Sequence, residues 1–366
     1  MCERIEDMLE KIVESECILR SIIEEIKTSQ LPLILYGAAC IAEKVYTYII
    51  GNNIIVDDVA VDSEYIDANN MFFDKTIISI DDVFMKYNQC NIIVGFYGMT
   101  NMKRKELLNN NIVNRVFEFD HAFIYHYGLS LEDVRKHHKG YQNTYDYLQD
   151  ELSRKTLTKF INARISGKIN YMTEVMQEVQ YFPNNIIKIT DNETFVDCGA
   201  YDGDTIKEFL KVTKGRYDKI YAFEPDIKNL EALNKNYSKY SDIEIHGAGI
   251  WSSRTILRFN ANKGTASLID IIGETTINVD TIDNIVNDNI VTYIKMDIEG
   301  AEFEALKGAE NTIKKYKPKL AVCVYHKIED LIDIPQLLKK MVPEYKLYLR
   351  QHSTNSTELV LYATID

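Results

Sequence analysis

The segment Glu193–Thr205, with the sequence ETFVDCGAYDGDT, constrains the fold of this chain more than any other. It is typical of an apolar strand that runs into a tight turn containing Gly199 and Gly203, with a helix after the turn. The next apolar strand ends at Glu224, 27 positions beyond Asp197. A strand, a glycine turn, a helix and a carboxylate closing the second strand form the unit that holds adenosine-bearing cofactors.

The spacing and charge of this turn indicate which cofactor it suits. A dinucleotide-binding turn uses GxGxxG, whereas the glycines here are spaced GxxxG. Three aspartates crowd the same turn: Asp197, Asp202 and Asp204. Carboxylates repel a pyrophosphate but suit a cofactor that carries a sulfonium and an ammonium group. We therefore expect S-adenosyl-L-methionine, with Glu224 accepting hydrogen bonds from its ribose hydroxyls and the glycines letting the backbone approach its methionyl part.

Three motifs resemble the FkbM-type family of S-adenosylmethionine-dependent methyltransferases. They are FVDCGAYDG at residues 195–203, FEPD at 223–226 and YIKMDIEGAE at 293–302. With the last strands, the resemblance covers about residues 186–366. It implies a seven-stranded class I methyltransferase sheet and O-methylation, commonly of sugars in surface polysaccharides or of natural products.

The expected cofactor-binding residues lie in the turn and at the end of the following strand. They are Asp197, Gly199, Ala200, Tyr201, Gly203, Asp204, Thr205, Glu224, Pro225 and Asp226. Pro225 and Asp226 have an alternative explanation, since both residue types also terminate strands.

The fourth strand of this unit carries charged residues to the edge where ligands bind in open α/β sheets. Strand alternation predicts Lys295, Asp297 and Glu299 on one side. His326 follows another apolar strand and is expected at the same edge. A sugar hydroxyl needs a base to take its proton, and Asp297 and His326 are the candidates. Lys295 and Glu299 complete the predicted catalytic set, although Lys295 could instead orient a carboxylate or be paired.

Asp297, Glu299 and Glu302 also resemble a site for a hard cation, because such ions favour oxygen ligands. Glu302, however, is expected in the first turn of a helix, where an acid suits the helix dipole. No metal is therefore predicted. The polar, small stretch 260–267 is predicted to be either a loop over the active site or an ordinary surface connection.

The 366 residues are too many for one ordinary domain. We predict two Rossmann-like, three-layer α/β units joined by helices. The predicted boundaries are an N-terminal helix over 1–30, a degenerate Rossmann-like domain over 31–125, a helical connector over 126–185 and the methyltransferase domain over 186–366. Strands are expected at 32–36, 54–61, 92–96 and 115–119, then at 194–197, 219–223, 244–250, 291–296, 319–324, 346–349 and 357–362. The last two should form an antiparallel hairpin.

The first unit has a strand–turn–helix whose glycines are degraded. A working GxGxxG would need glycine at positions 39 and 42, and both are alanine. Asp62, at the end of the second strand, could still receive a ribose hydroxyl. A scaffold, a dimer surface or an acceptor-recognition domain is nevertheless favoured over dinucleotide binding.

Composition excludes several classes of function. The net charge of −13 argues against a general nucleic-acid binder. No apolar run is long enough for a membrane span, and the charged N-terminus is unlike a signal peptide. Six cysteines without a CxxC pair indicate reduced thiols and a cytoplasmic location.

The leading prediction is an S-adenosylmethionine-dependent O-methyltransferase that acts on a sugar hydroxyl, in surface polysaccharide or glycan biosynthesis. Its partner would be a small-molecule or glycan acceptor, and a homodimer is possible. One alternative is a nucleotide-sugar-modifying oxidoreductase, against which stand the missing GxGxxG and the missing Tyr-x-x-x-Lys pair. The other is a non-catalytic binding protein that retains a cofactor-sized pocket.

Overall fold

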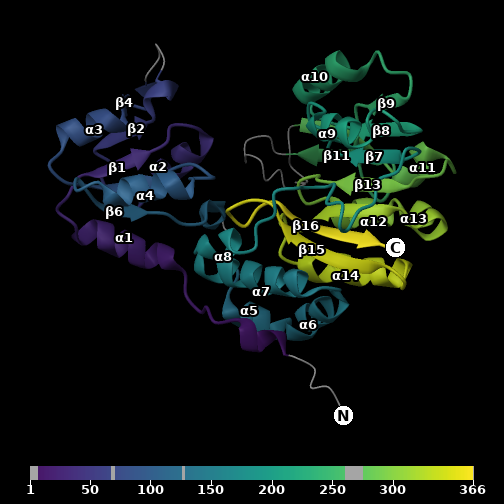
Figure 1. The fold of residues 1–366 in the computed structure, drawn as a ribbon, viewed down its shortest axis with the longest axis horizontal. Coiled ribbons are helices and arrows are strands. Elements are labelled where there is room, and N and C mark those ends of the chain that lie inside the picture. The colour runs from purple at the N-terminus through teal and green to yellow at the C-terminus, as the bar shows by residue number, and fades with distance from the viewer. Residues whose placement is uncertain (1–6, 67–70, 126–127, 260–274, 366) are drawn as a thin grey trace.

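The computed structural model describes residues 7–66, 71–125, 128–259 and 275–365. Within them the chain forms a six-stranded sheet and a seven-stranded sheet, both of mostly parallel strands with flanking helices, and a small three-stranded sheet (Figure 1). The predicted α/β architecture with a seven-stranded second sheet is therefore confirmed. The predicted loop over 260–267 lies outside the described residues.

The first sheet has the strand order β3-β4-β2-β1-β5-β6, parallel except for the β3–β4 pair. Its strands are β1 Leu33–Tyr36, β2 Asp58–Val61, β3 Met71–Phe72, β4 Lys75–Ser79, β5 Cys90–Val94 and β6 Val113–Phe117. The four predicted strands are present with shifted ends. Strands β3 and β4 were not predicted, because β3 has two residues and β4 is largely half-buried, without clear alternation.

The second sheet has the order β15-β16-β14-β13-β7-β8-β9. Its strands are β7 Thr194–Cys198, β8 Lys219–Phe223, β9 Ile243–His246, β13 Tyr293–Met296, β14 Lys319–Cys323, β15 Lys346–Gln351 and β16 Leu359–Thr364. Strands β15 and β16 pair antiparallel, which confirms the predicted hairpin. The order places β7 between β8 and β13, so the glycine turn and the charged end of β13 lie side by side.

One predicted strand, 244–250, is divided in the structure. Its first part is β9, and its second part, β10 (Gly249–Ile250), joins β11 (Thr255–Phe259) and β12 (Thr275–Asp280) in the three-stranded sheet. Strand β10 pairs parallel with β12, and β11 pairs antiparallel with β12. The sequence did not predict this separate sheet.

Fourteen α-helices occur in the described residues. They are α1 Ile18–Thr28, α2 Cys40–Gly51, α3 Ile80–Lys86, α4 Asn101–Asn109, α5 Leu131–Lys136, α6 His138–Tyr147, α7 Glu151–Ser166, α8 Asn170–Thr173, α9 Asp204–Val212, α10 Ile227–Tyr237, α11 Ile282–Val286, α12 Glu302–Lys307, α13 Glu310–Tyr316 and α14 Asp330–Met341. Three short 3-10 helices are η1 Met8–Lys11, η2 Ser63–Tyr65 and η3 His121–Tyr125. The N-terminal region thus contains η1 and α1 where one helix was expected.

The predicted connecting helices belong to the core of the second sheet. Val134, Tyr141, Leu157 and Phe160, from α5, α6 and α7, share one apolar cluster with residues of β7 and β13. The expected start of α5 is present, because the Ser130 hydroxyl and the Asp133 carboxylate form a capping box. In Figure 1 these helices lie beneath the seven-stranded sheet.

A buried polar network joins the end of the first sheet to the second. Asp120 is fully buried, and its two carboxylate oxygens accept the backbone N–H groups of Ala122 (3.0 Å) and Ser356 (2.8 Å). Arg164 donates to the Ser356 hydroxyl and to the Tyr325 carbonyl, both at 3.2 Å. The network therefore connects the segment after β6, helix α7 and the loop between β15 and β16.

Replacing Asp120 with alanine should destabilise the protein by about 1.5–3 kcal/mol, because a charged acceptor is lost and two buried N–H groups are left unpaired. Urea denaturation followed by circular dichroism measures the change. Asp191→Ala is the control, since its ion pair with Arg216 is exposed and should contribute little. Equal effects of the two substitutions would contradict a role for the Asp120 network.

Candidate active site

The turn after β7 requires glycine at two positions. Gly199 and Gly203 have φ values of +83° and +92°, in the left-handed region. A Cβ atom on Gly199 would lie 1.9 Å from the Asp297 carbonyl oxygen. The Gly199 and Ala200 N–H groups both donate to the Phe223 carbonyl, at 3.0 and 2.9 Å. The turn is therefore packed closely against the ends of β8 and β13.

Glu224 is locked to the same turn. Its carboxylate accepts the Tyr201 N–H at 2.9 Å and the Asp226 N–H at 2.8 Å, and the residue is buried. Burial raises the pKa of this carboxyl, although both N–H groups oppose the rise. Tyr201 itself is exposed, with a φ of +49°. Glu224 and the turn thus form one unit at the carboxyl end of β8.

The remaining predicted cofactor residues have identifiable local roles. The Asp226 side chain caps α10 by accepting the N–H groups of Lys228 and Asn229, at 2.9 and 3.0 Å. This cap agrees with the alternative explanation that the residue ends the strand. Asp204 begins α9 and accepts the Thr205 N–H at 2.7 Å. Thr205, like Ala200, is buried, whereas Pro225 is half-buried.

Asp197 and Lys295 form a buried ion pair beneath the turn. Their atoms Oδ1 and Nζ are 3.1 Å apart, and the side chains are 0% and 3% exposed. The ammonium also donates to the Gly199 carbonyl at 2.8 Å. Burial raises the pKa of Asp197 to about 6, against the effect of Lys295, so the carboxylate is ionised at neutral pH. Lys295 is thus paired within the sheet, and its partner is a carboxylate.

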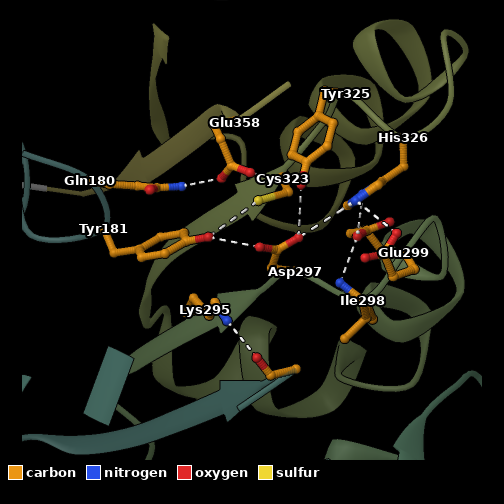
Figure 2. Close-up of polar contacts among 12 residues, drawn as sticks. Gln180, Tyr181, Lys295, Asp297, Ile298, Glu299, Cys323, Tyr325, His326 and Glu358 are labelled. Carbon is orange, nitrogen blue, oxygen red and sulfur yellow. Dashed lines mark hydrogen bonds and ion pairs between the residues drawn. The ribbon is translucent and has the colours of Figure 1, made fainter. Parts of the chain in front are cut away.

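Asp297 follows β13 directly and lies at the centre of a polar cage (Figure 2). The Tyr181 hydroxyl donates to Oδ2 at 2.9 Å, and the Tyr325 hydroxyl donates to Oδ1 at 3.4 Å. Burial acts to raise the pKa of Asp297, but Lys295 and His326 outweigh it and hold the pKa below its usual value. The cage therefore presents an ionised carboxylate at the sheet edge.

His326 comes from the loop after β14 and points toward Asp297 and Glu299 (Figure 2). Its Nε2 lies 3.6 Å from Asp297 Oδ1 and 3.6 Å from Glu299 Oε2. Its Nδ1 lies 3.0 Å from Glu302 Oε1. Burial lowers the pKa of the ring, but the carboxylates outweigh this and raise it to about 9. The ring is then charged at neutral pH, which disfavours it as a base.

Glu299 and Glu302 also belong to this cluster, but the local backbone that positions each of them is different. Glu299 has a φ of +56° beyond the end of β13, so strand alternation does not place it. Its side chain is 54% exposed, and partial burial with neighbouring carboxylates raises its pKa to about 7. Glu302 starts α12 as expected, yet it is fully buried, and its Oε1 accepts the Ile298 N–H at 2.9 Å. The expectation of a simple helix-start charge for Glu302 was therefore incomplete.

The cage contains residues that the sequence did not indicate. Besides Tyr181 and Tyr325, Glu358 accepts from Gln180 Nε2 at 2.7 Å, and it shares the single hydroxyl proton of Tyr325 with Asp297, at 3.3 Å. Tyr325 could have been found, because it precedes His326 at a predicted strand end. Tyr181 and Glu358 lie outside every motif, so no local signal identifies them.

At the corresponding edge of the first sheet, neighbouring side chains already contact the candidate carboxylate. Asp62, the candidate for a ribose hydroxyl, accepts the Tyr36 hydroxyl at 2.8 Å and pairs with Lys103 Nζ at 2.8 Å. A hollow of about 330 Å³ lies beside them, also lined by Phe96 and Thr100. These internal contacts already engage the carboxylate of Asp62.

In the parts of the chain that the structure describes, no helix combines the length and apolar character needed to cross a bilayer. Five cysteines in these parts are free thiols: Cys17, Cys40, Cys90, Cys198 and Cys323.

Comparisons with known proteins agree with the fold and with the class of domain. Residues 197–349 match the model of the methyltransferase FkbM domain. The fold is similar to the crystal structure of methyltransferase FkbM from Methylobacillus flagellatus KT, with a TM-score of 0.72 and 23% identity over 97% of this chain and 95% of that one. Aeropyrum pernix fibrillarin, solved with natively bound S-adenosyl-L-methionine, has a TM-score of 0.33 and 8% identity over 50% and 71% of the two chains, too low to support an argument. Among curated proteins no match was found.

The family match covers two of the three motifs in full and begins inside the first, at Asp197. It confirms the predicted family and methyltransferase class, and it supports S-adenosylmethionine as the cofactor. It also favours this class over the oxidoreductase alternative. Residues 197–349 of this chain thus form a methyltransferase domain that matches the FkbM family model.

Proposed function

We propose that this protein transfers the methyl group of S-adenosylmethionine to a hydroxyl of a sugar. The observation that carries the proposal is the ionised Asp297 carboxylate, held by two tyrosine hydroxyls beside the glycine turn. Gly199 and Asp297 are in backbone contact, so a cofactor on the turn and an acceptor at Asp297 would be adjacent. Placing the two reactants side by side supplies much of the acceleration in such a displacement.

The cofactor side of the site fits an adenosyl group. Among the described residues Glu224 accepts two backbone N–H groups, and a carboxylate has further lone pairs for ribose hydroxyls. Asp197 has no exposed surface, so we propose that it acts through Lys295, which fixes the Gly199 carbonyl. When bound, S-adenosylmethionine supplies an electrophilic methyl group on a sulfonium.

The acceptor side fits a polyhydroxylated molecule. A sugar oxygen would form the new bond to the methyl carbon as its proton passes to Asp297, and the bond from methyl to sulfur would break. Glu299 and Glu358 are further acceptors for sugar hydroxyls. The carboxylate-rich cage makes a phosphate group a poor fit at this position.

The resemblance to the FkbM-type family extends this proposal to a biological role. O-methylation of sugars suits surface polysaccharide or glycan biosynthesis. The free thiols of the described cysteines favour a cytoplasmic location. The first sheet would serve as a scaffold or acceptor-recognition domain, since Asp62 is already engaged.

The cofactor assignment predicts that Glu224→Gln weakens S-adenosylmethionine and S-adenosylhomocysteine binding about tenfold or more, because hydrogen bonds to a charged acceptor are lost. Isothermal calorimetry measures the dissociation constants. Glu231→Gln, on the exposed side of α10, is the matched control and should bind normally. Unchanged binding in Glu224→Gln would contradict the assignment.

The acceptor assignment predicts that Asp297→Asn lowers turnover about 10²–10⁴-fold while cofactor affinity stays the same. The amide keeps the shape of the side chain but cannot take the hydroxyl proton. Transfer of a tritiated methyl group to a panel of methyl glycosides and nucleotide sugars measures turnover, with Asp333→Asn, exposed on α14, as the control. If the wild type binds the cofactor but methylates no sugar, the sugar part of the proposal fails.

A further inference from the structure

We infer that Asp297, Glu302 and His326 bind a divalent cation, with Glu299 beside the open side of the ion. The inference deepens the proposed function and rests on it only for the chemical role of the ion. One ligand atom from each of the three residues lies within 4.8 Å of the other two. Two ligands on one ion, each at about 2.0–2.4 Å, can be separated by no more than about 4.8 Å.

Glu302 has a buried oxygen that the described residues leave without a hydrogen bond. The residue is 0% exposed, and its Oε1 is fixed by the Ile298 N–H at 2.9 Å. Its Oε2 has no hydrogen-bond partner within the described ranges. A buried carboxylate oxygen in this state is costly unless something satisfies it. A cation in the cluster would do so.

The ring of His326 also lacks hydrogen-bond partners. Its side chain is only 10% exposed, yet neither ring nitrogen has a hydrogen bond to any residue that the structure describes. The contact from Nδ1 to Glu302, at 3.0 Å, has an ion-pair distance without hydrogen-bond alignment. The distance of 3.6 Å from Nε2 to Asp297 is too long for a hydrogen bond but suits two ligands that share an ion.

Carboxylates also outnumber cationic side chains around the cluster. Asp330 is 3% exposed, and within the described chain its Oδ2 has no hydrogen-bond partner. Glu299 and Glu358 add further carboxylates at the rim. The nearby lysines do not pair with these carboxylates. Lys295 pairs with Asp197, and Lys327 donates to the Gly300 carbonyl. A divalent cation would offset this excess of negative charge.

The ligand chemistry indicates the kind of ion. Imidazole suits Zn²⁺ and related transition metals, whereas carboxylates suit Mg²⁺, Ca²⁺ and Mn²⁺, so a mixed set favours Mn²⁺ or Zn²⁺. An ion with open positions lowers the pKa of a hydroxyl bound to it. With the ion present, Asp297 would serve as a ligand and no longer as the base proposed above. The acceptor proton would then pass to Glu299, whose side chain is 54% exposed. Either role of Asp297 predicts loss of turnover in Asp297→Asn.

The test is a titration of the chelator-treated full chain with Mn²⁺, without cofactor or acceptor, followed by electron paramagnetic resonance of the free ion. We expect one Mn²⁺ per chain, displaced by Zn²⁺. Glu302→Gln and His326→Gln should each weaken binding about tenfold or more. Glu304→Gln is the matched control, because this glutamate lies on the same helix α12 but pairs with Lys307, and it should bind Mn²⁺ normally.

Cofactor binding, measured on each variant, shows that it is folded. If Glu302→Gln fails this check, His326→Gln and the wild-type titration decide. A wild type that binds neither Mn²⁺ nor Zn²⁺, or folded variants that bind Mn²⁺ as the control does, would overturn the inference and leave a charged His326 as the counter-ion. A wild type that binds Mn²⁺ but methylates no sugar would contradict the proposed function and leave the cation site standing.

Discussion

The buried pair of Asp197 and Lys295 is the interaction on which the candidate site depends. The two residues face each other across the neighbouring strands β7 and β13, and Lys295 also holds the Gly199 carbonyl. Removing one partner of such a pair leaves an uncompensated buried charge, which is strongly destabilising. Because Asp297 stands two residues beyond Lys295, one strand fixes both the glycine turn and the cage around Asp297.

The sequence predicts those parts of this arrangement whose residues lie close together in the chain, and it misses the parts whose residues lie far apart. The apolar runs that became β7, β8, β13 and β14 are local, and so are the glycine turn and Glu224. The cage around Asp297 is not local, because Tyr181 and Glu358 come from segments far away in the chain. Burial of Glu302 was equally hidden, since an acid at a helix start is ordinarily exposed.

The two halves of the chain share an α/β plan but differ in what occupies the ends of their strands. In the second sheet these ends carry glycines and carboxylates, and the carboxylates can accept further hydrogen bonds. In the first sheet the equivalent carboxylate, Asp62, is already held by Tyr36 and Lys103. The Asp120 network ties the first sheet to the loop between β15 and β16, and Arg164 extends it to Tyr325 in the cage. The first sheet is thereby part of the support for the site.

The backbone at Glu299 has an evolutionary consequence. Its φ of +56° is one that a residue with a side chain adopts at a cost, and Gly300 continues the left-handed turn at +91°. Glycine at position 299 would relax the backbone but remove the carboxylate from the cluster. Selection for stability alone would therefore erode this position, whereas selection for the carboxylate retains the strain. With the role proposed for Glu299, the residue at this turn would separate working relatives from those that have kept only the fold.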